Sequence, residues 1–126
     1  MPSVLVVDDD PDVRGLLETY LQLEGFDVLT ATNGWDALQR LRHARPSVIL
    51  LDLMMPVMDG VEFRRRQQEH PLLRNIPVVC LSARHDASKT AAALGLTECV
   101  AKPFDLERLI GVLRRHCSNP PAAGTA

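Results

Sequence analysis

The chain alternates short apolar runs with longer amphipathic segments. Runs of four branched apolar residues, such as Val4–Val7 and Val48–Leu51, are typical of strands that are buried on both faces of a parallel sheet. The pattern predicts five strands, at about Ser3–Val7, Phe26–Ala31, Ser47–Leu51, Val78–Leu81 and Cys99–Ala101. The second of these strands has the mixed composition of a strand at the edge of a sheet.

The segments between the runs carry helix start and stop signals. Asp10, Asn33 and Asp105 can cap helices, and Pro11 suits the first helical position. Apolar residues then recur at three-four spacing in three segments: Val13, Leu16, Leu17, Tyr20 and Leu21; Trp35, Leu38 and Leu41; and Leu106, Leu109, Ile110 and Leu113. A third helix should run to about His70, and a short fourth should span about Ser88 to Leu94. Strands that alternate with helices predict an α/β fold with helices on both sides of a parallel sheet.

Size and charge narrow the possible functions. A chain of 126 residues with 46% hydrophobic residues makes one domain with a full core. Its 14 basic and 16 acidic residues give a net charge of −2, so there is no global basic field of the kind that drives nucleic-acid binding. The runs Arg64–Arg66 and Arg114–Arg115 are interpreted as solvated helix faces. We expect no direct nucleic-acid binding by this chain.

The start of the chain and its cysteines bear on the compartment. The chain enters a strand almost at once, so we expect neither a signal peptide nor a membrane span. Cys80, Cys99 and Cys117 are an odd number without Cys-x-x-Cys spacing. We interpret them as thiols in a protein of the reducing cytoplasm. Those that lie in strands are expected to be buried.

Acidic residues stand at the ends of two of the predicted strands. Asp8 and Asp9 follow the first strand and Asp52 follows the third, while Lys102 closes the last. Ligands bind at the carboxyl ends of the strands in such sheets. At roughly 4 to 5 Å each pair of carboxylates would repel by about 3 to 4 kcal/mol at an effective dielectric constant of about 20. The cluster therefore predicts a bound cation.

Four motifs extend this pattern. They read Val-Val-Asp-Asp-Asp, Leu-Asp-Leu-Met-Met-Pro-Val-Met-Asp-Gly, Leu-Ser-Ala and Lys-Pro-Phe. With Asp8, Asp9, Asp52, Ser82 and Lys102 in this order, the chain resembles the receiver domain of two-component response regulators over residues 3 to 116. The resemblance implies a three-layer αβα, flavodoxin-like fold, with five helices around a five-stranded sheet in the order 2-1-3-4-5.

The resemblance also implies the chemistry. Asp52 would accept a phosphoryl group from a histidine kinase or a histidine phosphotransfer protein, and the new conformation would control an unknown downstream effector. Asp8, Asp9, Asp52 and the backbone carbonyl of Met54 would hold Mg²⁺, for which Mn²⁺ could substitute. Lys102 and Ser82 would contact the phosphoryl oxygens. Such a protein phosphorylates and dephosphorylates itself and is not a metabolic enzyme.

One position departs from the residue usual in the family, and two others vary within it. Cys99 stands where the family usually has an aromatic residue that reports phosphorylation, so we expect the loop from Ser82 to Asp86 and the fourth helix to carry the signal instead. Met54 and Arg84 flank the site at positions that tend to set how fast phosphate is lost. Arg84 is equally open to interpretation as a solvated side chain. The segment before Lys102 lacks the residues typical of one dimerising subfamily, and we therefore expect a monomer or a weak dimer.

Two other interpretations remain open. A phosphatase of the haloacid dehalogenase type also uses an aspartate at a strand end, Mg²⁺ and a lysine, but it requires a second aspartate where this chain has Met54. A pseudo-receiver would keep the fold as a protein-binding module without the chemistry. In either case residues 1–117 are expected to form the domain, and residues 118–126 a flexible tail or the start of an interdomain linker.

Overall fold

The structure is a computed structural model that describes residues 2–52, 60–82, 98–101 and 105–117, with the backbone alone for residues 60, 61, 82, 99 and 101. Five parallel strands form one sheet in the order β2-β1-β3-β4-β5. They are β1 (Ser3–Val7), β2 (Asp27–Ala31), β3 (Val48–Asp52), β4 (Val78–Ser82) and β5 (Glu98–Ala101). The predicted strand order is confirmed.

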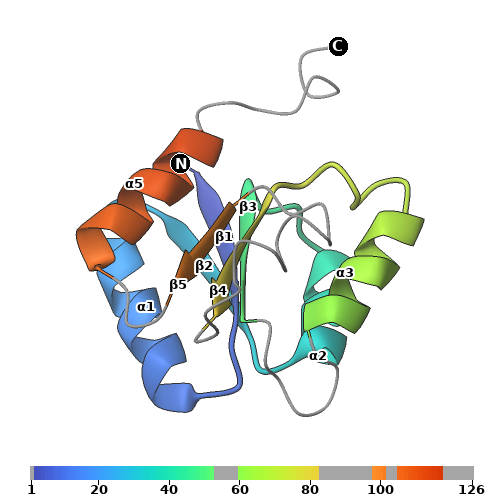
Figure 1. Ribbon diagram of the computed structural model, residues 1–126, viewed down its shortest axis with the longest axis horizontal. Helices are drawn as coiled ribbons and strands as arrows, with labels where there is room; N and C mark the ends of the chain where they lie inside the picture. Colours follow the sequence, from blue (N-terminus) through green and yellow to red (C-terminus); the bar gives the residue numbers. More distant parts are fainter. Residues whose placement is uncertain (1, 53–59, 83–97, 102–104, 118–126) are drawn as a thin grey trace.

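Helices cover both faces of the sheet (Figure 1). Within the described residues they are α1 (Pro11–Leu23), α2 (Gly34–Leu41), α3 (Gly60–Glu69) and α5 (Leu106–Cys117). Helices α1 and α5 lie on one side of the sheet, and α2 and α3 lie on the other (Figure 1). The fourth helix that we predicted falls outside the described residues. No helix in the described part of the chain is long and apolar enough to cross a membrane.

The core has two halves because side chains alternate along each strand. In β1, Leu5 and Val7 pack with α2 and α3, while Val4 and Val6 pack with α1 and α5. Every residue of β3 is buried, which explains its continuous apolar run. Strand β2 has partners on one side only and is only partly buried, so its predicted position at the edge is confirmed.

The predicted caps are present. Asp10 Oδ1 accepts hydrogen bonds from the N–H groups of Asp12 (2.9 Å) and Val13 (3.4 Å), and Pro11 opens α1. Asn33 caps α2 by accepting from the Asp36 N–H at 2.8 Å. These bonds satisfy backbone donors that have no partner inside the helix. Gly25 follows α1 with a φ of 94°, a conformation that favours glycine.

Two apolar residues that we assigned to helix faces are half exposed. Leu16 is 52% exposed, because α1 centres its buried face on Leu17 and Leu21. Trp35 is 49% exposed, and the Arg66 guanidinium carbon lies 5.0 Å from the centroid of its ring. Helical spacing predicts which residues share a face, but it does not show how far the buried face extends.

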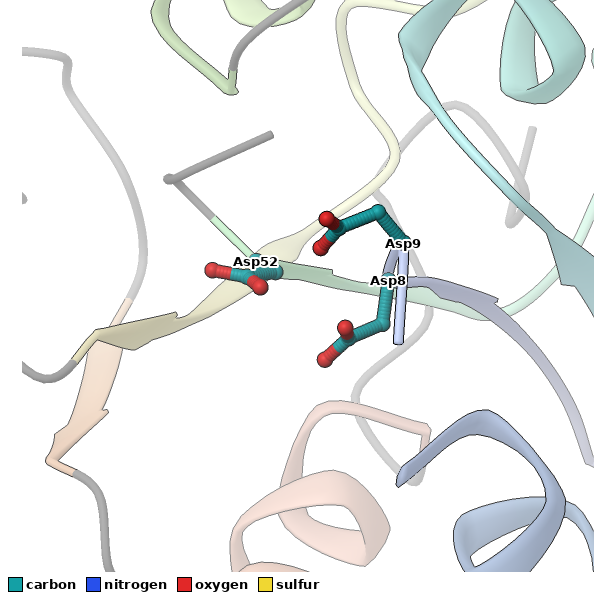
Figure 2. Close-up of side chains that lie close together, drawn as sticks. All are labelled: Asp8, Asp9 and Asp52. Atoms are coloured by element: carbon teal, nitrogen blue, oxygen red, sulfur yellow. The ribbon is translucent and has the colours of Figure 1, made fainter. Parts of the chain in front are cut away.

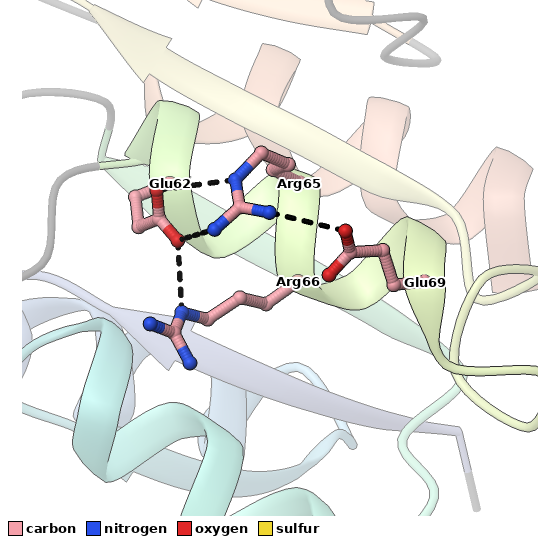
Figure 3. Close-up of polar contacts among 4 residues, drawn as sticks. All are labelled: Glu62, Arg65, Arg66 and Glu69. Atoms are coloured by element: carbon pink, nitrogen blue, oxygen red, sulfur yellow. Dashed lines mark hydrogen bonds and ion pairs between the residues drawn. The ribbon is translucent and has the colours of Figure 1, made fainter.

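The arginine run in α3 is only partly solvated. Arg65 and Arg66 are exposed and form ion pairs with Glu62, and Arg65 also pairs with Glu69 (Figure 3). Arg64 is 7% exposed, so the solvated-face interpretation is wrong for this residue. It points inward and donates to Gln67 Oε1 at 2.8 Å, and burial lowers the pKa of its guanidinium.

The cysteines also depart from the prediction. Cys80 is fully buried in β4 and is disulfide-bonded, so the interpretation as a thiol is wrong there. Cys117, at the end of α5, is free and half-buried. Burial raises the pKa of the Cys117 thiol, and a hydrogen bond with Ser47 opposes that rise. Sequence spacing did not show that strand pairing places Cys80 opposite Cys99.

Candidate phosphoacceptor and metal site

The first acidic residue is held by the strand that precedes it. Asp8 follows β1, and its backbone N–H donates to the Ala31 carbonyl oxygen at 3.2 Å, which continues the pairing of β1 with β2. Its side chain is fully buried. Asp8 Oδ1 accepts a hydrogen bond from the Asp10 N–H at 3.0 Å. The turn after β1 therefore fixes the direction of this carboxylate.

A second bond ties the same turn to α1. Arg14, in the first turns of the helix, donates from Nη1 to the backbone carbonyl oxygen of Asp8 at 2.9 Å. Asp10 links both ends of the turn, since its side chain caps α1 while its N–H binds Asp8. The strand end and the helix start thus hold each other in place.

Asp52 comes from the neighbouring strand. It is the last residue of β3, is 5% exposed, and is paired in register with Leu81 of β4. Because Val7 is the partner of Leu51 in the pairing of β1 with β3, Asp8 and Asp52 leave the sheet at the same level. We predicted that the strand ends at Leu51 and that Asp52 follows it. In the structure β3 extends one residue further, so Asp52 is its last residue.

The three carboxylates converge. One oxygen each from Asp8, Asp9 and Asp52 lies within 4.8 Å of the others, and Figure 2 shows the side chains meeting at the ends of β1 and β3. Asp9 is exposed while the other two are buried, so the group opens toward solvent through Asp9. The predicted convergence of the acidic residues is confirmed.

This arrangement fits a small, hard cation. At 4.8 Å two carboxylates repel by about 3.5 kcal/mol at an effective dielectric constant of about 20, and less where water screens Asp9. An all-oxygen donor set suits Mg²⁺ or Mn²⁺ and offers nothing to metals that prefer sulfur or imidazole. A divalent ion would relieve the repulsion and still leave coordination positions for water or substrate.

The other predicted site residues are only partly placed. The backbone of Ser82 ends β4 and is paired with Ala101 of β5; its side chain is not described. Met54, Arg84 and Lys102 lie outside the described residues. Cys99 is placed by its backbone alone, opposite Cys80.

Arg14 is the residue near the site that sequence reasoning missed. No motif includes it, but one signal was present: it stands four residues after the helix cap Asp10, one turn along the helix and on the side of the cap. A long side chain at that position can reach back over the strand end. Three positions separate Arg14 from Asp10, the last residue of the acidic motif, so the motif itself does not point to Arg14.

Comparison with known proteins identifies the family. The family model for the response regulator receiver domain matches residues 4–114. The chain belongs to the response regulator receiver family. The resemblance inferred from the sequence is therefore confirmed, as is the flavodoxin-like fold.

Relatives of the receiver include whole regulators and short proteins. The transcriptional regulatory protein CpxR homolog of Haemophilus influenzae is 40% identical over 124 residues, which is 94% of this chain and 53% of that protein. Protein PilG of Pseudomonas aeruginosa is 33% identical and is matched over 86% of its length, by 90% of this chain. The receiver thus spans about half the length of several transcriptional regulators that it matches.

Solved structures agree with the fold. The chemotaxis response regulator CheY4 of Vibrio cholerae has a TM-score of 0.85 and 35% identity, covering 92% of this chain and 98% of that one. The response regulator TrrA of Thermotoga maritima, in complex with Mg²⁺–BeF, has a TM-score of 0.82 and 28% identity, covering 92% and 99%. A receiver of the same fold is therefore known with magnesium bound.

Proposed function

We propose that Asp52 accepts a phosphoryl group from a histidine kinase or a histidine phosphotransfer protein. The position of Asp52 carries this proposal: the residue is 5% exposed at the end of a central strand, and a carboxylate oxygen lies within 4.8 Å of oxygens of Asp8 and Asp9. An Asp52 oxygen would attack the phosphorus atom as the bond from phosphorus to the donor nitrogen breaks and that nitrogen takes a proton from water, leaving an aspartyl phosphate on the receiver and a neutral histidine on the donor.

Asp8, Asp9 and Asp52 would hold Mg²⁺, together with the backbone carbonyl of Met54. When bound, the ion would offset the negative charge that three carboxylates and an incoming phosphoryl group bring to one place. The turn between β1 and α1 has the separate task of holding the Asp8 side chain, through the Asp10 N–H and the Arg14 bond to the Asp8 carbonyl oxygen. A preset direction lowers the cost of ordering the ligand when the ion binds.

The remaining roles rest on the family resemblance. Lys102 and Ser82 would contact the phosphoryl oxygens, and Arg84 and Met54 would influence how long the phosphate persists. Cys99 replaces the usual aromatic reporter. We propose that residues 1–117 form the phosphoacceptor unit in the cytoplasm, with residues 118–126 as a tail or linker, and that the phosphorylated state acts on a downstream effector. Metabolic catalysis is not part of this proposal.

Incubation with acetyl phosphate tests the proposal. In the presence of Mg²⁺ the intact mass should rise by one phosphoryl group, and chelation by EDTA should abolish the rise. Asp52→Asn should remove it, whereas Asp27→Asn, on an exposed residue at the start of β2, should leave it unchanged. No rise in the wild-type mass would support the pseudo-receiver interpretation instead, and a rise that persists in Asp52→Asn would place the phosphoryl group elsewhere.

A further inference from the structure

The buried disulfide of β4 is a feature that phosphoryl transfer does not use. Cys80 is fully buried and disulfide-bonded. The sequence contains three cysteines, and Cys117 is free. Within one chain, the sequence therefore leaves Cys99 as the partner of Cys80.

The backbone supports this assignment. Cys80 and Cys99 are directly opposed in the parallel pairing of β4 with β5. Neighbouring strands lie about 4.8 Å apart, inside the range of about 4.4 to 6.8 Å between the Cα atoms of disulfide-bonded cysteines. Alternation along the strands agrees, since Leu81 and Val100, the next opposed pair, both pack on the side of α1 and α5. Positions 80 and 99 therefore share the opposite face of the sheet.

We propose that Cys80 and Cys99 are a site of reversible thiol oxidation that links β4 covalently to β5. The oxidant would be a low-molecular-weight disulfide such as oxidised glutathione. One cysteine thiolate attacks a glutathione sulfur and releases one glutathione thiolate; the second cysteine then attacks the mixed disulfide and releases the other. The two cysteines give up two protons and two electrons, and oxidised glutathione becomes two molecules of reduced glutathione.

The setting favours a reversible bond over a structural one. The chain has a full core of its own on both faces of the sheet, and a domain of this size does not need a disulfide in order to fold. Strand β5 lies at the edge of the sheet and, among the described strands, is paired with β4 alone, so the bond would join the edge strand to its one neighbour in the sheet. Because Cys80 is buried, exchange should be slow, over minutes to hours.

The free cysteine is a poor competitor for this chemistry. Cys117 lies in a helix and has no cysteine opposed to it in the described strand pairs, so no neighbouring thiol resolves a mixed disulfide between Cys117 and glutathione, and reduced glutathione reverses it. Cys117 lies at the end of α5, whereas the proposed pair lies within the sheet. Oxidation should therefore leave Cys117 as a thiol.

The link closes a loop that includes the whole segment between β4 and β5. Such a bond removes conformations from the unfolded chain and so stabilises the folded one. For a loop of about 20 residues in a domain of this size, the oxidised protein should melt roughly 10 °C above the reduced protein. This expectation does not depend on phosphorylation, so its failure would leave the proposed function standing.

Differential alkylation tests the assignment. The full chain is equilibrated overnight in excess oxidised or excess reduced glutathione, quenched with acid and alkylated with N-ethylmaleimide under denaturing conditions. The oxidised protein should carry one adduct, mapped to Cys117, and the reduced protein should carry three. Three adducts after oxidation, or a disulfide that joins two chains on a non-reducing gel, would overturn the proposal.

Matched variants separate the pair from the free thiol. In Cys117→Ser the oxidised protein should carry no adduct and should keep the difference of roughly 10 °C in melting temperature between the two states. In Cys99→Ala and in Cys80→Ala that difference should vanish, and two cysteines should be alkylated after the reducing incubation. Cys99→Ala serves as the main variant, since Cys80 is part of the core. A difference that persists in Cys99→Ala would contradict the link.

Discussion

The Arg14 guanidinium donates a hydrogen bond of 2.9 Å to the backbone carbonyl oxygen of Asp8, and this bond fastens the start of α1 to the end of β1. Arg14→Met keeps a long side chain but removes the hydrogen-bond donor, so the partly buried carbonyl oxygen of Asp8 loses this hydrogen bond. We expect the free energy of unfolding to fall by about 1 to 2 kcal/mol, measured by urea denaturation. Arg42→Met, on an exposed arginine after α2, should change it by less than about 0.5 kcal/mol. Equal effects in the two variants would mean that the bond does not hold the turn.

Removing an acidic side chain should have opposite effects with and without magnesium. Asp9→Asn relieves repulsion among the three carboxylates, so in EDTA the variant should melt slightly above the wild type. With excess Mg²⁺ the wild type gains stability because the ion binds the folded state, and the variant should gain less. Differential scanning fluorimetry in both conditions measures this, with Asp27→Asn as the control. An equal magnesium-dependent shift in Asp9→Asn and the wild type would exclude Asp9 as a ligand.

Gln67 is a buried polar anchor in α3. It is fully buried, its Nε2 donates to the carbonyl oxygens of Leu73 (2.8 Å) and Ile76 (3.1 Å), and its Oε1 accepts from Arg64. Gln67→Ala leaves these groups without their partner inside the protein, so we expect a loss of about 2 to 4 kcal/mol in the free energy of unfolding. Gln22→Ala, on the exposed side of α1, should cost less than about 0.5 kcal/mol. A small effect at Gln67 would show that water satisfies these groups equally well.

The ion pairs in Figure 3 should depend on pH. The hydrogen bond from Arg65, followed by that from Arg66, lowers the pKa of the Glu62 carboxyl. A lowered pKa in the folded state contributes stability above the pKa of the unfolded chain, and that stability is lost as the pH falls through the folded pKa. The melting temperature of the wild type should exceed that of Glu62→Gln at about pH 7, and the gap should close as the pH falls through the lowered pKa of Glu62 in the folded protein. Added salt should narrow the gap at neutral pH, and a gap that widened on acidification would reverse the assigned sign.

Local signals in the sequence predicted much of the fold. The apolar runs that form β1 and β3 and the caps at Asp10 and Asn33 depend on neighbouring residues, so the sequence shows them directly. The strand order and the roles of the acidic residues came instead from the family resemblance. The convergence of Asp8, Asp9 and Asp52 followed once the strands were taken to be parallel neighbours, because the carboxyl ends of such strands meet at one edge.

Contacts between distant segments were not predictable in the same way. Arg64 is buried and donates to the buried Gln67, and no periodicity in α3 marks one arginine of three as buried. The opposition of Cys80 and Cys99 depends on the register of β4 and β5, and a shift of one residue would put them on opposite faces. Arg14 was missed because its partner is a backbone oxygen, which is the same for every residue type.

Locating the phosphoryl group tests the central claim most directly. After incubation with acetyl phosphate and Mg²⁺, sodium borohydride reduces an aspartyl phosphate to homoserine, which peptide mass spectrometry places in the sequence. We expect homoserine at position 52, and none there when EDTA replaces Mg²⁺. Homoserine at Asp8 or Asp9, or its absence from position 52 in protein whose mass has risen by a phosphoryl group, would contradict Asp52 as the phosphoacceptor.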